Sequence, residues 1–259
     1  MTKLAANLTM LFNEVPFMER FAQAAQAGFK GVECLFPYHY PAADIAAQLE
    51  THRLELVLHN LPAGAWERGE RGIACDPERV EEFKQGVATA IAYATALRVK
   101  RVNCLVGTLP SNVSVERAQA TLVANLSYAA GKLQQAGIKL LIEAVNTVDI
   151  PGFFLSGTTQ ALELIAATGS DNIFLQYDIY HMQKMEGDLA NTLKANLARI
   201  GHVQLADNPG RGEPGSGEIN YRYLFALLDE LGYEGWIGCE YKPRAGTLDG
   251  LGWRAAHGL

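Results

Sequence analysis

The sequence lacks any lysine- or arginine-rich block, and its 259 residues carry a formal net charge of −6. Proteins that bind nucleic acid usually present a basic patch or stripe, so we expect no nucleic-acid partner. No apolar run approaches the ~20 residues of a membrane-spanning helix, and the first residues contain no apolar segment long enough for a signal peptide. We therefore expect no membrane partner.

Cysteine is scarce, and the chain has no C-x-x-C pair. The cysteines are Cys34, Cys75, Cys104 and Cys239. Three of them lie in apolar, strand-like runs, where a cysteine is usually a small buried hydrophobic residue. Scattered, unpaired cysteines are typical of a reducing compartment, so we expect a cytoplasmic protein.

No glycine-rich phosphate loop follows the first strand-like run, which continues as Thr9–Glu14. A doubly wound dinucleotide-binding sheet usually carries such a loop there. Its absence disfavours this main alternative fold without excluding it. The sequence also contains no Gly-x-Ser-x-Gly elbow and no P-loop.

Short apolar runs alternate with helical patterns along the whole chain. The strands are expected at Leu4–Leu8, Gly31–Phe36, Leu54–His59, Arg101–Val106, Lys139–Glu143, Ile173–Asp178, His202–Ala206 and Trp236–Glu240. The helices are expected at Phe17–Ala27, Pro41–His52, Pro77–Leu97 (capped by Asp76), Val115–Ala136, Thr158–Ala167, Leu189–Arg199 and Tyr221–Leu231, with a weaker one in the C-terminal tail. Strands that are apolar on both faces are typical of a parallel sheet covered by helices. This pattern, with no linker between its parts, predicts a single (β/α)₈ TIM barrel over residues 1–259.

Four consecutive predicted strands deliver polar side chains near their C-terminal ends. These are Glu143, Asp178, Gln204 and Glu240. The active site of such a barrel lies at this end of the strands. Three carboxylates facing one another would repel, and a divalent cation would relieve that repulsion. Oxygen ligands of this kind suit Mg²⁺ or Mn²⁺, whereas the alternative is that each carboxylate is a separate surface residue or salt-bridge partner.

Five further residues are candidates for substrate binding. They are His59, Arg71, His181, Arg211 and Lys242. The cations would meet an anionic group, although an isolated Lys or Arg is more often a solvated surface residue. His59 would otherwise be a packing residue, and His181 a cap of the next helix. The segment Gly69–Gly72 has the composition of a lid, or of a mobile surface loop.

At these residues the chain resembles the hydroxypyruvate isomerase family of xylose-isomerase-like barrels, including the 2-oxo-tetronate isomerases. The stretches that carry the resemblance are Ala5–Phe12, Leu58–Gly64, Gly69–Ala74, Gln176–His181, Gly212–Tyr221 and Gly235–Pro243. The resemblance implies that Glu143 and Glu240 are catalytic and that Glu143, Asp178, Gln204 and Glu240 bind the metal.

The reaction implied is the interconversion of hydroxypyruvate and tartronate semialdehyde by proton transfer through an enediolate. The substrate is thus expected to be a small anionic hydroxy-keto acid, and a homo-oligomer is compatible with the sequence. The first alternative is a 2-oxo-tetronate isomerase. Ketose 3-epimerases are a further alternative, but they usually have a histidine where this chain has Gln204. A metal-dependent endonuclease is disfavoured by the low histidine count and the negative charge, and a non-catalytic binding barrel is the last alternative.

Overall fold

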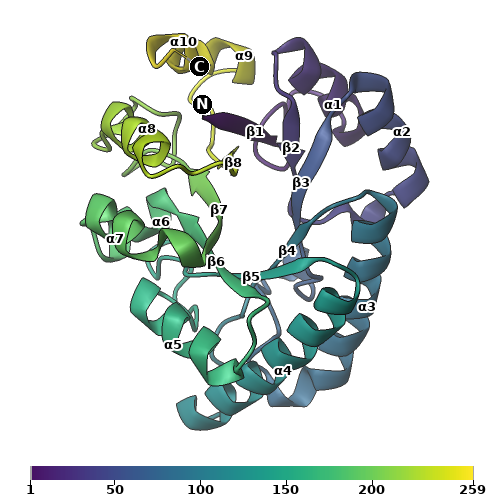
Figure 1. Cartoon of the computed structure of the whole chain (residues 1–259). Helices are drawn as coiled ribbons and strands as arrows, with labels where there is room; N and C mark the ends of the chain where they lie inside the picture. Colours follow the sequence, from purple (N-terminus) through teal and green to yellow (C-terminus); the bar gives the residue numbers. More distant parts are fainter. Residues whose placement is uncertain (1, 259) are drawn as a thin grey trace.

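The computed structural model describes residues 2–258 and confirms a closed barrel of eight parallel strands in sequence order (Figure 1). The end residues 1 and 259 of the expected domain lie outside this range. The strands are β1 (Lys3–Asn7), β2 (Gly31–Glu33), β3 (Glu55–Asn60), β4 (Arg101–Cys104), β5 (Lys139–Glu143), β6 (Ile173–Asp178), β7 (Ile200–Leu205) and β8 (Trp236–Cys239). Pairing of β1 with β8 closes the barrel and leaves no exposed sheet edge.

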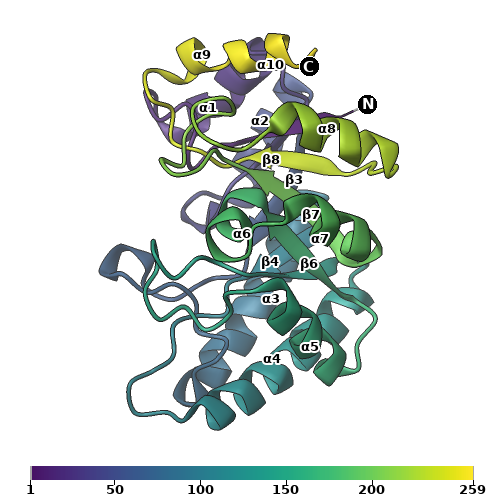
Figure 2. The same ribbon diagram turned by 90° about the vertical axis from the view of Figure 1, so that its left-hand side faces the viewer.

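Helices surround the barrel and bury the outer face of its strands (Figures 1 and 2). They are α1 (Phe17–Gln26), α2 (Ala42–His52), α3 (Val80–Ala96), α4 (Val115–Gln135), α5 (Thr158–Thr168), α6 (Ile179–Met185), α7 (Leu189–Asn196), α8 (Tyr221–Glu230), α9 (Thr247–Gly250) and α10 (Gly252–Ala256). This covering explains why the strands are apolar on both faces. No helix within residues 2–258 is long and apolar enough to cross a membrane.

Side-chain caps fix where several helices begin. Ser114 Oγ accepts a hydrogen bond from the Arg117 amide at the start of α4, and Asn220 Oδ1 accepts one from Tyr223 at the start of α8. As expected, Asp76 caps the segment after it, through a 2.9 Å hydrogen bond from the Glu78 amide. That segment begins with a 3₁₀ turn, because Arg79 (φ −120°, ψ 21°) interrupts the helical backbone before α3.

Some strand ends differ from the expectation by a few residues. The second strand ends at Glu33 rather than Phe36, because Pro37 begins a short 3₁₀ helix soon after it. The seventh begins two residues early, at Ile200. The largest omission from the sequence prediction is α6, which starts directly after Asp178 with no intervening loop.

The inside of the barrel has an apolar layer and a polar layer. The apolar layer is a small buried cluster of Ala5, Val57, Leu58 and Leu141, against which Phe174 and Trp236 pack. Side chains two positions further along a strand point to the same side. Asn7, Glu143 and Gln176 therefore follow Ala5, Leu141 and Phe174 into the polar layer at the C-terminal ends of the strands, where the candidate site lies.

Candidate active site

A cavity of about 430 Å³ opens at the C-terminal ends of the strands. Its walls include three of the four predicted metal ligands, Glu143, Gln204 and Glu240. The fourth, Asp178, is fully buried at the end of β6 and is not among the residues that line the cavity. The closed barrel thus brings together side chains that are far apart in the sequence.

Glu143 and Asp178 each use one carboxylate oxygen for structure. Glu143 Oε2 accepts hydrogen bonds from Asn103 Nδ2 (3.0 Å) and Gln176 Nε2 (2.9 Å). Asp178 Oδ1 caps α6 by accepting from the Tyr180 and His181 amides at 2.7 and 3.2 Å. Asp178 Oδ2 is buried and accepts no hydrogen bond from any residue within 2–258.

The other carboxylate oxygens converge on His181. Its Nε2 atom lies 3.9 Å from Glu143 Oε1 and 3.8 Å from Asp178 Oδ2. Donor atoms of these three residues lie within 4.8 Å of one another, an arrangement that could hold a metal ion. A buried carboxylate oxygen with no donor is costly, and a cation would remove this cost, so the donor set fits a divalent metal.

The ring of His181 presents a proton donor to this cluster. The Asn146 backbone amide, which can only donate, lies 3.3 Å from Nδ1, so Nδ1 is the acceptor. Burial, opposed by Asp178, lowers the pKa of His181 to about 4, which keeps the ring neutral near pH 7. The single proton therefore resides on Nε2, and a protonated ring nitrogen does not bind a metal.

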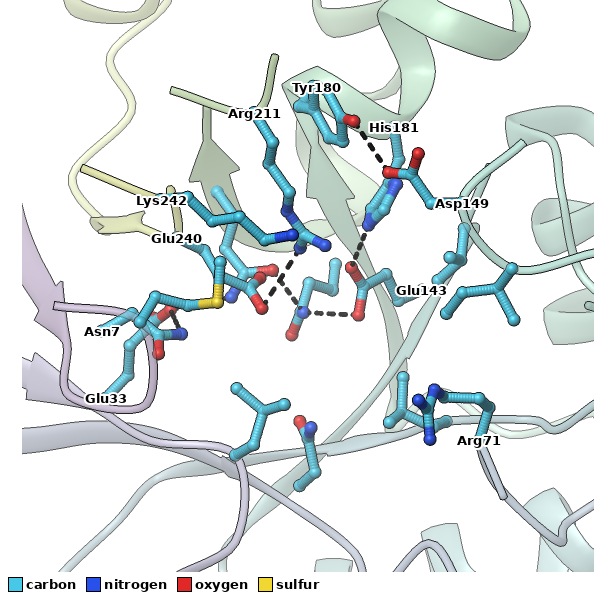
Figure 3. Close-up of a pocket in the computed structure, with 18 of the residues that line it drawn as sticks. Asn7, Glu33, Arg71, Glu143, Asp149, Tyr180, His181, Arg211, Glu240 and Lys242 are labelled. Carbon is cyan, nitrogen blue, oxygen red and sulfur yellow. Dashed lines mark hydrogen bonds and ion pairs between the residues drawn. The ribbon is translucent and has the colours of Figure 1, made fainter. Parts of the chain in front are cut away.

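Glu240 and Arg211 form the opposite part of the site (Figure 3). Arg211 Nη2 lies 3.4 Å from Glu240 Oε1, and its guanidinium stands 5.4 Å from the centre of the Tyr180 ring. The backbone of Arg211 is left-handed (φ 55°) and its carbonyl accepts a 2.7 Å hydrogen bond from the Lys242 amide. This bond ties together the loops that carry the two cations, and both cations line the cavity.

Burial and crowding of like charges raise the carboxyl pKa values. The pKa of Glu143 lies well above its ordinary value, because of burial and then of the nearby Glu240 and Asp178. Burial also raises the pKa of Glu240, although Arg211 opposes this shift. The raised pKa values favour the protonated forms of these two carboxyls, and general acid catalysis needs a carboxyl that holds a proton.

Arg71, on the loop after β3, reaches the cavity from the side across from Arg211 (Figure 3). Its guanidinium lies 4.2 Å from the centre of the Trp66 ring and donates to the carbonyls of Trp66 and Glu70. Arg71 thus joins His181, Arg211 and Lys242 around the cavity.

His59 is the one predicted substrate contact that does not line this cavity. Its Nδ1 atom lies 3.1 Å from the Tyr38 hydroxyl. The rings of Tyr38 and His59 pack edge to face. Neighbouring strand residues point to opposite faces, so Asn60 lines the cavity while His59 packs outside it.

Sequence reasoning assigned no role to a set of buried polar residues near the predicted ligands. They are Asn7, Glu33, Asn103, Gln176 and His202. Their common signal is a polar residue on an otherwise apolar strand, as in the pairs Gln176–Asp178 and His202–Gln204 with period-two spacing. A strand with such a pair carries polar groups into the barrel interior.

Residues 21–257 match the family model described as the xylose isomerase-like TIM barrel. The chain belongs to this family. Among curated members, hydroxypyruvate isomerase of Escherichia coli (strain K12) is 56% identical over 253 residues, which cover 98% of each chain. The 2-oxo-tetronate isomerase of Cupriavidus necator is 45% identical over 98% of this chain and 97% of that protein. Accordingly, this member of the xylose isomerase-like family is an isomerase with a small-molecule substrate.

Solved structures agree on the fold. A structure from Brucella melitensis, described as an AP endonuclease of family 2, superposes with a TM-score of 0.96 at 44% identity and covers 99% of both chains. The 3-keto-D-glucoside 4-epimerase of E. coli superposes with a TM-score of 0.82 at 20% identity and 99% coverage of both chains. The latter likeness concerns the xylose isomerase-like fold alone.

Proposed function

We propose that the chain interconverts hydroxypyruvate and tartronate semialdehyde. The observation that carries the proposal is the meeting of Glu143, Glu240 and Arg211 in one cavity, in a chain 56% identical to a hydroxypyruvate isomerase. The two glutamates can transfer protons, and the arginine can bind the carboxylate of an acidic substrate.

The reaction removes a proton from C3 of hydroxypyruvate and delivers a proton to C2, while the hydroxyl proton passes from O3 to O2. One of Glu143 and Glu240 takes the C3 proton and the other supplies the C2 proton. Both carboxyls line the cavity, and burial raises the pKa of each, which favours the protonated form that the acid needs. His181, with its proton on Nε2, donates to the substrate oxygen that becomes negative in the enediolate.

The cations orient the substrate. Arg211, Lys242 and Arg71 line the cavity, and one of these cations meets the substrate carboxylate. Arg211 also pairs with Glu240, so binding of the substrate carboxylate places the reacting carbons beside a proton-transfer group.

Glu143, Asp178, Gln204 and Glu240 would hold the metal, Mg²⁺ or Mn²⁺. When bound, it would supply a Lewis acid for the carbonyl and hydroxyl oxygens of the substrate. Among the described residues, the unpartnered Asp178 Oδ2 is the best support for this assignment.

The second candidate is a 2-oxo-tetronate isomerase, favoured by relatives 44–45% identical over nearly the full chain. Its substrate carries one more hydroxymethyl carbon and undergoes the same proton transfer. An endonuclease, as the Brucella structure is described, is a weaker candidate: within residues 2–258, a single histidine, His181, lies with the carboxylates that could hold a metal, and the net charge is −6. Ketose 3-epimerases are similar in fold, at low sequence identity.

Incubation in D₂O tests the proposal. The protein, stripped with EDTA and reloaded with Mg²⁺ or Mn²⁺, is given hydroxypyruvate or 2-oxo-tetronate, and product and deuterium uptake are followed by NMR. We expect deuterated tartronate semialdehyde from hydroxypyruvate, and Glu240→Gln should keep the fold but lose about 10³-fold in turnover. Faster turnover of 2-oxo-tetronate would favour the second candidate, and no deuterium uptake from either acid would refute both.

A further inference from the structure

Glu33, at the end of β2, lies at the centre of a buried hydrogen-bond network. Its Oε1 atom accepts from Asn7 Nδ2 (2.9 Å) and Gln204 Nε2 (2.7 Å), and its Oε2 atom lies 2.7 Å from His202 Nε2. Only 1% of its surface is exposed. Since β2 and β7 are not neighbours in the barrel, these bonds cross the barrel interior. Both oxygens of Glu33 are already engaged by donors, so Glu33 is a poor candidate for a metal ligand.

The contact with Glu33 determines how the Gln204 side chain is turned. A carboxylate can only accept hydrogen bonds, so the Gln204 atom that faces it must be the amide nitrogen. The amide oxygen must then face away from Glu33, where it accepts a 2.6 Å hydrogen bond from Gln176 Nε2. The same Gln176 nitrogen also donates to Glu143 Oε2. The Gln204 oxygen is thereby held on the side of Glu143.

The barrel leaves room for this arrangement at Gly238 on β8. A Cβ atom at this position would lie 2.4 Å from both carboxylate oxygens of Glu33. Real Cβ atoms do not approach so closely, so any other residue at 238 would displace the Glu33 carboxylate. The absence of a side chain at Gly238 on β8 is therefore a second feature, separate from Gln204, that leaves the Glu33 carboxylate in its observed position.

We propose that Glu33 is a positioning residue that fixes the orientation of the Gln204 carboxamide, so that its oxygen rather than its nitrogen is offered to the metal. This inference rests on the proposed function, in which Gln204 is a metal ligand. An amide oxygen binds Mg²⁺ and Mn²⁺, whereas an amide nitrogen does not, and a flipped Gln204 would be lost as a ligand. Outer residues that orient ligands commonly change metal affinity by about 10–100-fold.

The first test is Glu33→Gln, measured by titration of the metal-free protein with Mn²⁺ and detection of free Mn²⁺ by EPR. The carboxamide introduced in place of Glu33 can donate as well as accept, so Gln204 can turn either way. We expect the Kd for Mn²⁺ to rise at least about tenfold. The matched control is Glu186→Gln, which makes the same change at a carboxylate that accepts from Thr158 and lies outside the cavity lining. Its Mn²⁺ affinity should match the wild type.

A charge exchange separates orientation from simple loss of structure. In the double variant Glu33→Gln, Gln204→Glu the charge is kept, and the carboxylate at 204 offers an oxygen whichever way it turns. We expect this variant to recover most of the lost Mn²⁺ affinity, while Gln204→Glu alone places two carboxylates against each other and binds no better than Glu33→Gln. Gly238→Ala, which leaves every charged and ligating residue in place, should weaken Mn²⁺ binding in the same direction.

Circular dichroism and thermal melts establish that each variant is folded before its affinity is compared. Wild-type affinity in Glu33→Gln, or no recovery in the folded double variant, would overturn the inference. If the wild type itself binds no Mn²⁺ and shows no isomerisation, the proposed function fails instead, so the two failures are distinguishable.

Discussion

At the scale of single residues, His181 lies among the proposed metal ligands but is expected to act as a donor. The Asn146 amide occupies its Nδ1 atom, which leaves the proton on the nitrogen that faces Glu143 and Asp178. We therefore expect His181→Ala to lower kcat by about 10²–10³-fold, the effect of removing one oxyanion donor. The Kd for Mn²⁺ should change by less than about tenfold. Steady-state kinetics and Mn²⁺ titration measure the two effects separately.

The control for His181 is His59→Gln. His59 is buried against Tyr38 outside the cavity, so its replacement should lower the melting temperature and leave kcat nearly unchanged. A fall in Mn²⁺ affinity as large as the fall in kcat in His181→Ala would instead mark His181 as a ligand. A large loss of kcat in His59→Gln would restore it as a substrate contact.

The candidate site residues could be predicted to the extent that each ends an apolar strand. Glu143 and Asp178 follow this rule, and Glu240 comes directly after β8. The interactions of Glu33 could not be predicted, because they join β2 to β7 across the barrel and depend on how far each side chain reaches. The tautomer of His181 depends on a backbone amide 35 residues away, which no local pattern reveals.

At the scale of elements, the loop after β3 is anchored by one carboxylate. Glu70 accepts hydrogen bonds from the Ala65 amide (2.5 Å) and from Arg79 Nη1 (2.7 Å), just before α3. These bonds hold the turn that presents Arg71 to the cavity. We expect Glu70→Gln to raise amide exchange in residues 61–75 by up to about fivefold, since a partly exposed ion pair contributes about 0–1 kcal/mol. The KM should rise more than kcat falls.

The control is Glu82→Gln, which removes the other carboxylate bound to Arg79 but none of the loop contacts.

The stability of the loop should depend on pH in a defined direction. Arg79 and then the Ala65 amide lower the pKa of Glu70. The contribution of ionised Glu70 to the stability of the loop is therefore complete above about pH 4.3, the ordinary pKa of a glutamate. This contribution is lost as the pH falls through the lowered pKa of Glu70. After correction for intrinsic rates, loop exchange should rise below about pH 4 in the wild type but not in Glu70→Gln; the same rise in both would refute the anchor.

Element prediction succeeded where periodicity and caps agree, and it failed where one residue serves two elements. The strands β5 and β6 have the expected bounds, and α4 begins at Val115 as expected. The helix α6 was missed because Asp178 is both the last residue of β6 and the cap of α6. Such a junction leaves no polar or glycine-rich gap to separate strand from helix in the sequence.

At the scale of the whole molecule, barrel closure gathers negative charge that the sequence distributes over a long stretch of the chain. Glu143, Asp178 and Glu240 meet at one end of the barrel, with Arg211 as the neighbouring cation. The raised carboxyl pKa values show that folding disfavours their ionised forms. A cation that binds these strand ends together should therefore stabilise the folded barrel as a unit.

We expect Mn²⁺ to raise the melting temperature, and EDTA to reverse the rise. At a free concentration about 100 times its Kd, a ligand specific for the folded state adds about 2.7 kcal/mol. For a chain of 259 residues this corresponds to a shift of about 5–10 °C. Asp178→Asn should abolish most of the shift without lowering the melting temperature of the metal-free protein, because it removes a carboxylate whose Oδ2 lacks a donor among residues 2–258. An undiminished shift in that variant would show that Mn²⁺ binds elsewhere on the molecule.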